Sequence, residues 1–71
     1  MAASPSPAQV RQMGRWLQLT LQQRDRYGWR RTNAGEYARQ AQTAPESLLG
    51  PKLETFVAIC AAEGVTPEPQ P

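Results

Sequence analysis

Apolar side chains recur at intervals of three and four residues in two parts of this chain, and this spacing constrains the fold more than any other feature. The first series comprises Val10, Met13, Leu17 and Leu21. The second comprises Leu53, Phe56, Val57, Cys60 and Ala61. Residues at this spacing share one face of an α-helix. No segment alternates apolar and polar residues as a strand would, so the sequence predicts an all-α fold.

Helix-start and helix-stop residues divide the chain into four predicted helices, three long and one short, in a small bundle. A Ser, Thr or Asn caps a helix start, Pro is tolerated in the first turn, and Gly in the left-handed conformation closes many helix ends. The expected starts lie at Ser6 with Pro7, at Thr32 or Asn33, at Thr43 with Glu46 in a capping box, and at Pro51. The expected glycine caps are Gly28, Gly50 and Gly64.

The core is expected to combine the two stripes with several aromatic and aliphatic side chains near them. The side chains expected to point inward are Trp16, Leu19, Trp29, Leu48 and Leu49. The second helix offers only a thin apolar face, made of Ala34, Tyr37, Ala38 and Ala41. Such a helix must pack closely to be held. Gly14 lowers helix stability by roughly 1 kcal/mol relative to Ala, unless another backbone packs against it.

Composition excludes several kinds of site. The chain has 71 residues, one Cys and no His, so it can form neither an internal disulfide nor the usual zinc site or His-based catalytic arrangement. We therefore expect no enzyme activity and no cofactor. No apolar run is long enough to span a membrane, and the first residues lack the features of a secretory signal. These observations favour a cytoplasmic protein with one helical domain at 8–66, between disordered proline-rich tails at 1–7 and 67–71.

Charge is distributed unevenly between the two halves of the chain. Residues 1–40 carry seven arginines against two acidic residues, a net charge of +5, whereas residues 41–71 carry one lysine against four glutamates, a net charge of −3. Four of the chain's eight cationic side chains lie in the stretch RDRYGWRR, residues 24–31. These arginines are suited to gripping phosphates. Alternatively, Arg24 and Arg26 complement a helix C-terminus, while Arg30 and Arg31 are merely solvated.

Part of the sequence resembles the helix-turn-helix of lambda-repressor-like (Cro-type) transcription regulators. The segment EYARQAQTAPESLL has Ala38, Gln42 and Leu48 at the spacing of the motif's small residue, turn residue and aliphatic residue. PKLETFVAICAAEGVTP resembles a later helix of that family, and Arg24, Gly28 and Trp29 resemble the end of its first helix. The resemblance implies a compact helical bundle that binds DNA. Gln42 stands where the family usually has Gly.

These observations lead to the expectation of a small transcription regulator, of the kind that phages, plasmids and bacteria encode, with DNA as its partner. The expected phosphate contacts are Arg24, Arg26, Arg30, Arg31 and Arg39, and the expected base readers are Gln40, Gln42 and Ser47. A homodimer could form through a second stripe on the last helix, made of Thr55, Ile59 and Ala62. The alternative is a module that docks on an acidic protein surface, such as that of RNA polymerase. An antitoxin-like protein would combine both activities.

Overall fold

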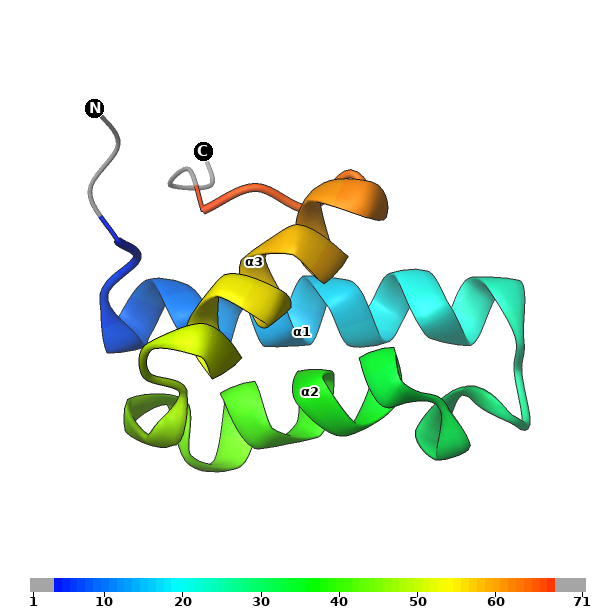
Figure 1. Ribbon diagram of the computed structural model, residues 1–71. Helices are drawn as coiled ribbons and strands as arrows, with labels where there is room; N and C mark the ends of the chain where they lie inside the picture. Colours follow the sequence, from blue (N-terminus) through cyan, green and yellow to red (C-terminus); the bar gives the residue numbers. More distant parts are fainter. Residues whose placement is uncertain (1–3, 68–71) are drawn as a thin grey trace.

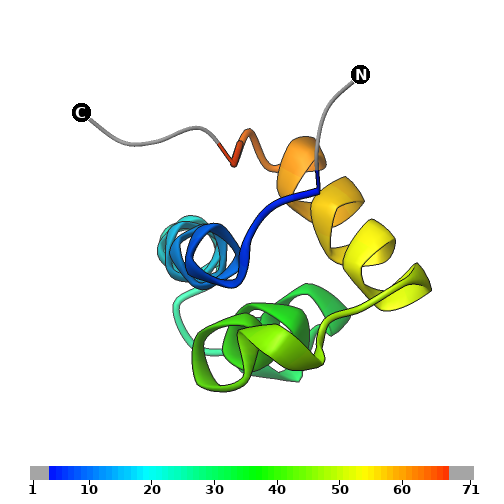
Figure 2. The ribbon, with the colours of Figure 1, turned by 90° about the vertical axis from the view of Figure 1, so that its left-hand side faces the viewer.

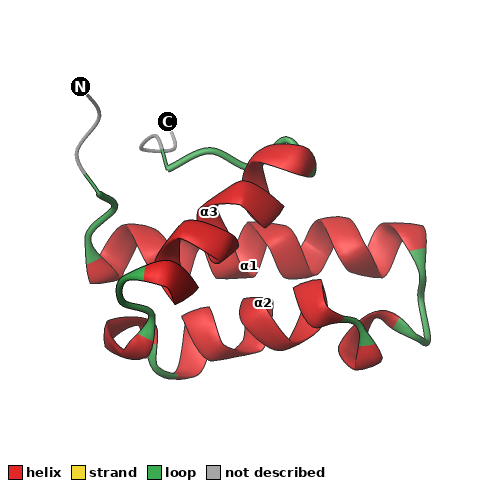
Figure 3. Ribbon diagram, viewed as in Figure 1, coloured by secondary structure: helices red, strands yellow, loops and turns green. Residues whose placement is uncertain are grey.

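The computed structural model describes residues 4–67; the expectations for residues 1–3 and 68–71 lie outside that range. Within it, three α-helices and two single-turn 3₁₀ helices follow one another, with no strand (Figures 1 and 3). In chain order these are α1 (Pro7–Arg24), η1 (Trp29–Arg31), α2 (Asn33–Thr43), η2 (Pro45–Ser47) and α3 (Pro51–Ala62). The all-α prediction is confirmed. The prediction of four helices is wrong, because the expected short helix after Thr43 is only the turn η2.

The start of α1 agrees with the sequence. The Ser6 hydroxyl accepts a hydrogen bond from Gln9 N at 3.2 Å, and Ser6 N donates to the Gln9 side-chain oxygen at 2.8 Å. This reciprocal box satisfies backbone groups that the helix leaves without partners. Pro7 occupies the first helical position, as predicted.

The end of α1 differs from the expected glycine cap. The helix stops at Arg24, and the Asp25 carboxylate accepts hydrogen bonds from Tyr27 N at 3.3 Å and Gly28 N at 3.0 Å. The Asp25 side chain therefore ends α1 with a turn that includes Gly28, in place of a left-handed glycine cap. Gly28 has a φ of −101°, so it is not left-handed.

The side chain of Thr32 caps α2 by accepting a hydrogen bond from Gly35 N at 2.9 Å, which confirms one of the two predicted caps. Thr43 does not cap a following helix. It is the last residue of α2, and its hydroxyl donates to the Arg39 carbonyl at 3.0 Å. A Thr hydroxyl used in this way is not available to the backbone of the next segment.

Glycines in the left-handed region flank α3. Gly50, with a φ of +56°, precedes the helix, and Gly64, with a φ of +80°, follows it. Beyond Gly64 the chain folds back, so that Val65 N donates to the Cys60 carbonyl at 2.8 Å and the Val65 side chain is buried. This is the hydrophobic contact expected past a glycine cap, and it confirms the predicted end of this helix.

The two helices α1 and α2 lie side by side, and α3 crosses the pair on one side (Figures 1 and 2). They approach closely at Gly14, where an added β-carbon would lie 2.6 Å from the Ala41 β-carbon and 2.9 Å from the Ala38 carbonyl oxygen. The absence of a side chain at Gly14 thus allows the small residues of α2 to reach α1. The buried hydrophobic core comprises Val10, Met13, Leu17, Leu21, Trp29, Ala38, Ala41, Leu48, Phe56, Cys60 and Val65.

Three side chains predicted to point inward are exposed. Trp16 and Leu19 are 41% and 44% exposed, and Leu49 is 69% exposed. On α1 the buried face is already filled by Val10, Met13, Leu17 and Leu21, so Trp16 and Leu19 fall outside it. Leu48 is buried and Trp29 is 5% exposed, as predicted.

The predicted stripe on α3 is only partly buried. Phe56 and Cys60 are fully buried, Leu53 and Val57 are half-buried, and Ala61 is exposed. The helix therefore contacts the rest of the bundle through a narrow face. None of the helices among residues 4–67 combines the length and the apolar character that crossing a membrane requires.

Candidate nucleic-acid interface

The four arginines of RDRYGWRR are separated by the turn that Asp25 closes. Arg24 is the last residue of α1, Arg26 lies in the turn, and Arg30 and Arg31 belong to η1. Arg26 and Arg31 are exposed, and neither lines the two hollows described below. The four arginines therefore do not line one hollow together.

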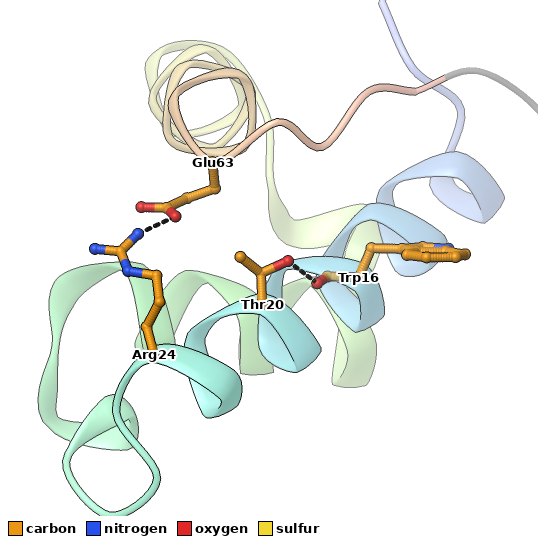
Figure 4. A network of polar contacts seen from close by, with 4 residues as sticks. All are labelled: Trp16, Thr20, Arg24 and Glu63. Atoms are coloured by element: carbon orange, nitrogen blue, oxygen red, sulfur yellow. Dashed lines mark hydrogen bonds and ion pairs between the residues drawn. The ribbon is translucent and has the colours of Figure 1, made fainter.

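Arg24 has an ion-pair partner within the protein, although its side chain is largely exposed. Its guanidinium forms an ion pair with the Glu63 carboxylate, which joins the end of α1 to the end of α3 (Figure 4). The hydrogen bond that Arg24 donates to this carboxylate, and the negative charge of the carboxylate, raise the pKa of Arg24. One turn earlier on α1, the Thr20 hydroxyl donates to the Trp16 carbonyl at 3.0 Å. Within residues 4–67, Arg24 is thus the one predicted phosphate contact that forms an ion pair.

Arg30 and Arg39 do come together. They line a hollow of about 470 Å³ with Gln18 of α1 and Trp29 of η1. The Arg30 guanidinium carbon lies 5.5 Å from the centroid of the Trp29 ring, a distance at which a cation is attracted to an aromatic face. Because the Trp29 side chain is buried, it gives the Arg30 side chain a fixed surface to rest on.

A second hollow of about 270 Å³ lies along the same pair of helices. It is lined by Ala8, Arg11, Gln12, Arg15 and Gln42. Arg11 and Arg15 were not among the residues predicted to bind phosphates. The signal that could have found them is their spacing, because Arg11, Arg15 and Gln18 lie at i, i+4 and i+7 and so share one face of α1.

A pair of glutamines joins the two hollows. Gln42 lines one and Gln18 the other, and the Gln42 amide nitrogen donates to the Gln18 side-chain oxygen at 2.6 Å. The same nitrogen lies 3.2 Å from the Ala38 carbonyl oxygen and 3.4 Å from that of Gly14. We call the surface formed by Arg11, Arg15, Gln18, Arg30, Arg39 and Gln42 the arginine seam. Among residues 4–67, no aspartate or glutamate lines either of its hollows.

The predicted base readers are not gathered on one surface. Gln42 is half-buried, and its amide N–H groups are used between α1 and α2. The Gln40 amide donates to the Ser47 hydroxyl at 2.8 Å, and that hydroxyl donates to the Ala44 carbonyl at 2.7 Å. Because Gln40 follows Arg39 directly, it points about 100° further around α2, away from the seam.

The segment that resembles a helix-turn-helix has a different geometry from the one the resemblance implies. Ala38 and Leu48 are buried, as the small and aliphatic positions of such a motif require. However, Gln42 lies inside α2 rather than in a turn, and the recognition helix is replaced by the single turn η2, Pro45–Ser47. One turn is too short to lie along the major groove as a recognition helix does.

The residues suggested for a dimer interface lie on the exposed side of α3. Thr55 and Ala62 are exposed and Ile59 is half-buried. The Thr55 hydroxyl donates to the Pro51 carbonyl at 2.9 Å, within its own helix. Self-association through these residues stays a prediction.

No group of three metal-ligating side chains gathers anywhere in residues 4–67. No protein-family model matches the chain, and neither a curated protein nor a solved structure matches it significantly. The site is therefore interpreted from its own geometry.

Proposed function

We propose that the protein is a small DNA-binding regulator that contacts backbone phosphates through the arginine seam. The observation that supports this proposal is the placement of four arginines from three elements, Arg11 and Arg15 of α1, Arg30 of η1 and Arg39 of α2, around two hollows that no described acidic residue lines. Guanidinium groups match the geometry of phosphate oxygens and keep their charge at any physiological pH.

The seam has a length suited to a nucleic-acid backbone. Arg11 and Gln18 are seven positions apart, which corresponds to roughly 10 Å along a helix at about 1.5 Å per residue. One strand of a DNA duplex advances by about three phosphates over that length of its axis, at a rise of roughly 3.4 Å per nucleotide. Since the Gln18 and Gln42 amides bind each other, the groups that the seam offers to DNA are mainly its charged guanidinium groups. Binding should depend little on DNA sequence.

The experiment is a fluorescence anisotropy titration of labelled duplex DNA over a range of salt concentrations. We expect binding at low salt, with a logarithmic affinity that falls linearly with the logarithm of salt concentration. The double variants Arg11→Gln/Arg15→Gln and Arg30→Gln/Arg39→Gln should each reduce the slope by about 2, the loss of two phosphate contacts.

The matched control is Arg26→Gln/Arg31→Gln, which removes the same charge from exposed positions outside both hollows. If DNA binding depended only on net charge, all three double variants would lose affinity equally. That result, or no binding to duplex DNA at low salt, would contradict the proposal.

A second candidate function is docking on another protein, and the exposed Trp16 and Leu19 favour it. They lie three positions apart on α1, so they share a face of the helix, and neither lines the hollows of the seam. Exposed tryptophans are enriched where interfaces gain most of their affinity. A pull-down from nuclease-treated lysate should then retain a stoichiometric protein with the wild type and lose it with Trp16→Ser/Leu19→Ser. Retention by both proteins would argue against this surface.

A further inference from the structure

We infer that the hollow lined by Gln18, Trp29, Arg30 and Arg39 is a subsite for one phosphate group. This subsite deepens the proposed function, because it is the part of the arginine seam where a phosphate is held in a fixed position. The inference rests on the proposed function only for the identity of the molecule that carries the phosphate. The phosphate site itself can be tested without DNA.

The first argument is that Arg30 is held in place before any ligand arrives. Its guanidinium carbon lies over the ring of Trp29, 5.5 Å from the ring centroid, and Trp29 is 5% exposed. The backbone of η1 is fixed at both ends, since Arg31 N donates to the Gly28 carbonyl at 3.1 Å and Thr32 N donates to the Trp29 carbonyl at 3.2 Å. A charged group that is already ordered loses less conformational entropy when it binds.

The second argument is that the polar side chains around this hollow are donors. Arg30 and Arg39 have only N–H groups to offer. Gln18 has an oxygen and an amide N–H₂ group, but the oxygen already accepts from Gln42 at 2.6 Å. The Gln18 N–H₂ group takes no part in that bond and remains a donor for a ligand. Three donor groups from η1, α2 and α1 thus surround one space, and two of them carry positive charge, which favours an anion with several oxygens.

The third argument is the contrast with the other hollow of the seam. Arg11 and Arg15 come from one helix, and the hollow that they line, at about 270 Å³, is smaller than the 470 Å³ hollow. No aromatic ring among its lining residues supports either guanidinium. Phosphates there are met by long side chains that must first be ordered. The subsite is accordingly assigned to the hollow beside Trp29.

The test uses the fluorescence of Trp29 as the readout. In the variant Trp16→Phe, Trp29 is the single tryptophan of the chain. The probe is inorganic pyrophosphate, titrated against sodium chloride of equal ionic strength. We expect a saturable change in Trp29 emission with pyrophosphate that chloride does not produce.

The decisive variant is Arg39→Gln in the same background, because Arg39 lines the hollow without being stacked on the tryptophan. We expect it to weaken pyrophosphate binding at least about tenfold, the effect of losing one hydrogen bond to a charged group. Arg31→Gln removes the same charge from the neighbour of Arg30 and should leave binding within about twofold. Circular dichroism of each variant checks that the helices are intact.

The outcomes separate the subsite from the DNA-binding proposal. The subsite is wrong if pyrophosphate produces no saturable change in Trp29 emission, or if Arg31→Gln weakens pyrophosphate binding as much as Arg39→Gln does. This holds even if duplex DNA binds through Arg11 and Arg15. If pyrophosphate binds as expected and also displaces labelled duplex DNA, both proposals are supported. If it binds as expected while the protein binds no DNA at low salt, the subsite stands and its phosphate belongs to another kind of ligand.

Discussion

Gly14 of α1 lies so close to Ala41 of α2 that a β-carbon added to it would be 2.6 Å from the Ala41 β-carbon. The Ala38 carbonyl oxygen would be only 2.9 Å away. Unlike the end of a flexible side chain, neither neighbour can move without shifting the backbone of α2. This contact sets how near the two helices lie, and therefore how near the arginines of α1 are to Arg39 across the seam.

The first prediction is that Gly14→Ala destabilises the protein, although Ala favours a helix over Gly by roughly 1 kcal/mol. Overpacking a closely packed site usually costs about 1–3 kcal/mol, and here the backbone of α2 must yield. We expect a net loss in the free energy of unfolding of up to about 2 kcal/mol, from the difference of these two effects. Urea denaturation followed by circular dichroism measures it.

The double variant Gly14→Ala/Ala41→Gly provides the control for this prediction. It removes the nearer of the two clashing atoms and leaves the Ala38 carbonyl in place. We expect the double variant to be more stable than the sum of the two single losses predicts, which is the mark of two residues in contact. A Gly14→Ala variant more stable than the wild type would show that the helices are not in close contact at this point.

The second prediction concerns the two tryptophans, which the structure places in opposite environments. Trp29→Ala removes a buried side chain and should cost about 3–5 kcal/mol, which is a large part of the stability of a small domain. Trp16→Ala removes a side chain that is 41% exposed, so the loss should be much smaller. Urea denaturation measures the free energy of unfolding of both variants. Equal losses would contradict the finding that Trp29 is in the core and Trp16 is not.

The helices could be predicted from the sequence because their signals are local. The stripe on α1, the Ser6 cap and the glycine after α3 each depend on residues within a few positions of one another. The direction of Trp16 could not be predicted in the same way. Trp16 lies at the edge of the apolar stripe of α1. Whether that edge is covered depends on where α3 crosses α1, which is a tertiary relationship.

The same reason explains why the structure separates the arginines that the sequence groups together. Arg30 and Arg39 line a common hollow, but Arg24 is paired with Glu63, which lies 39 positions further along the chain. That pairing depends on the return of α3 to the end of α1. Arg11 and Arg15 line a hollow with Gln42 only because α2 packs beside them, against Gly14. Neighbours in the sequence therefore do not show which arginines share a surface, because that depends on how the helices pack.

The third prediction concerns Gly64, which has a φ of +80°. An added β-carbon there would have nothing within 4 Å, so any loss of stability comes from the backbone conformation alone. Gly64→Ala should cost roughly 1–2 kcal/mol, the penalty of a left-handed conformation for an ordinary residue. Gly64→Asn should cost less, because Asn tolerates this conformation better. Equal losses in thermal or urea denaturation would point to a cause other than φ.

The fourth prediction concerns Cys60, whose pKa depends on its burial. The side chain is fully buried on α3, and burial raises the pKa of the thiol to about 12 from an ordinary value of 9.0. Between these two values the folded protein keeps a proton that the unfolded chain loses. The free energy of unfolding should therefore fall as the pH rises from 9 toward 12, by at most about 1.4 kcal/mol per pH unit from this group.

Below pH 9 the thiol is protonated in both states, so it should add no pH dependence there. The control is Cys60→Ala, which cannot ionise at this position. Every other group that titrates above pH 9 is common to both proteins, so the difference between their stability curves isolates Cys60. We expect the wild type to lose stability more steeply than Cys60→Ala between pH 9 and 11. Parallel curves would mean that the thiol becomes exposed to water in the folded protein, and would place Cys60 outside the core.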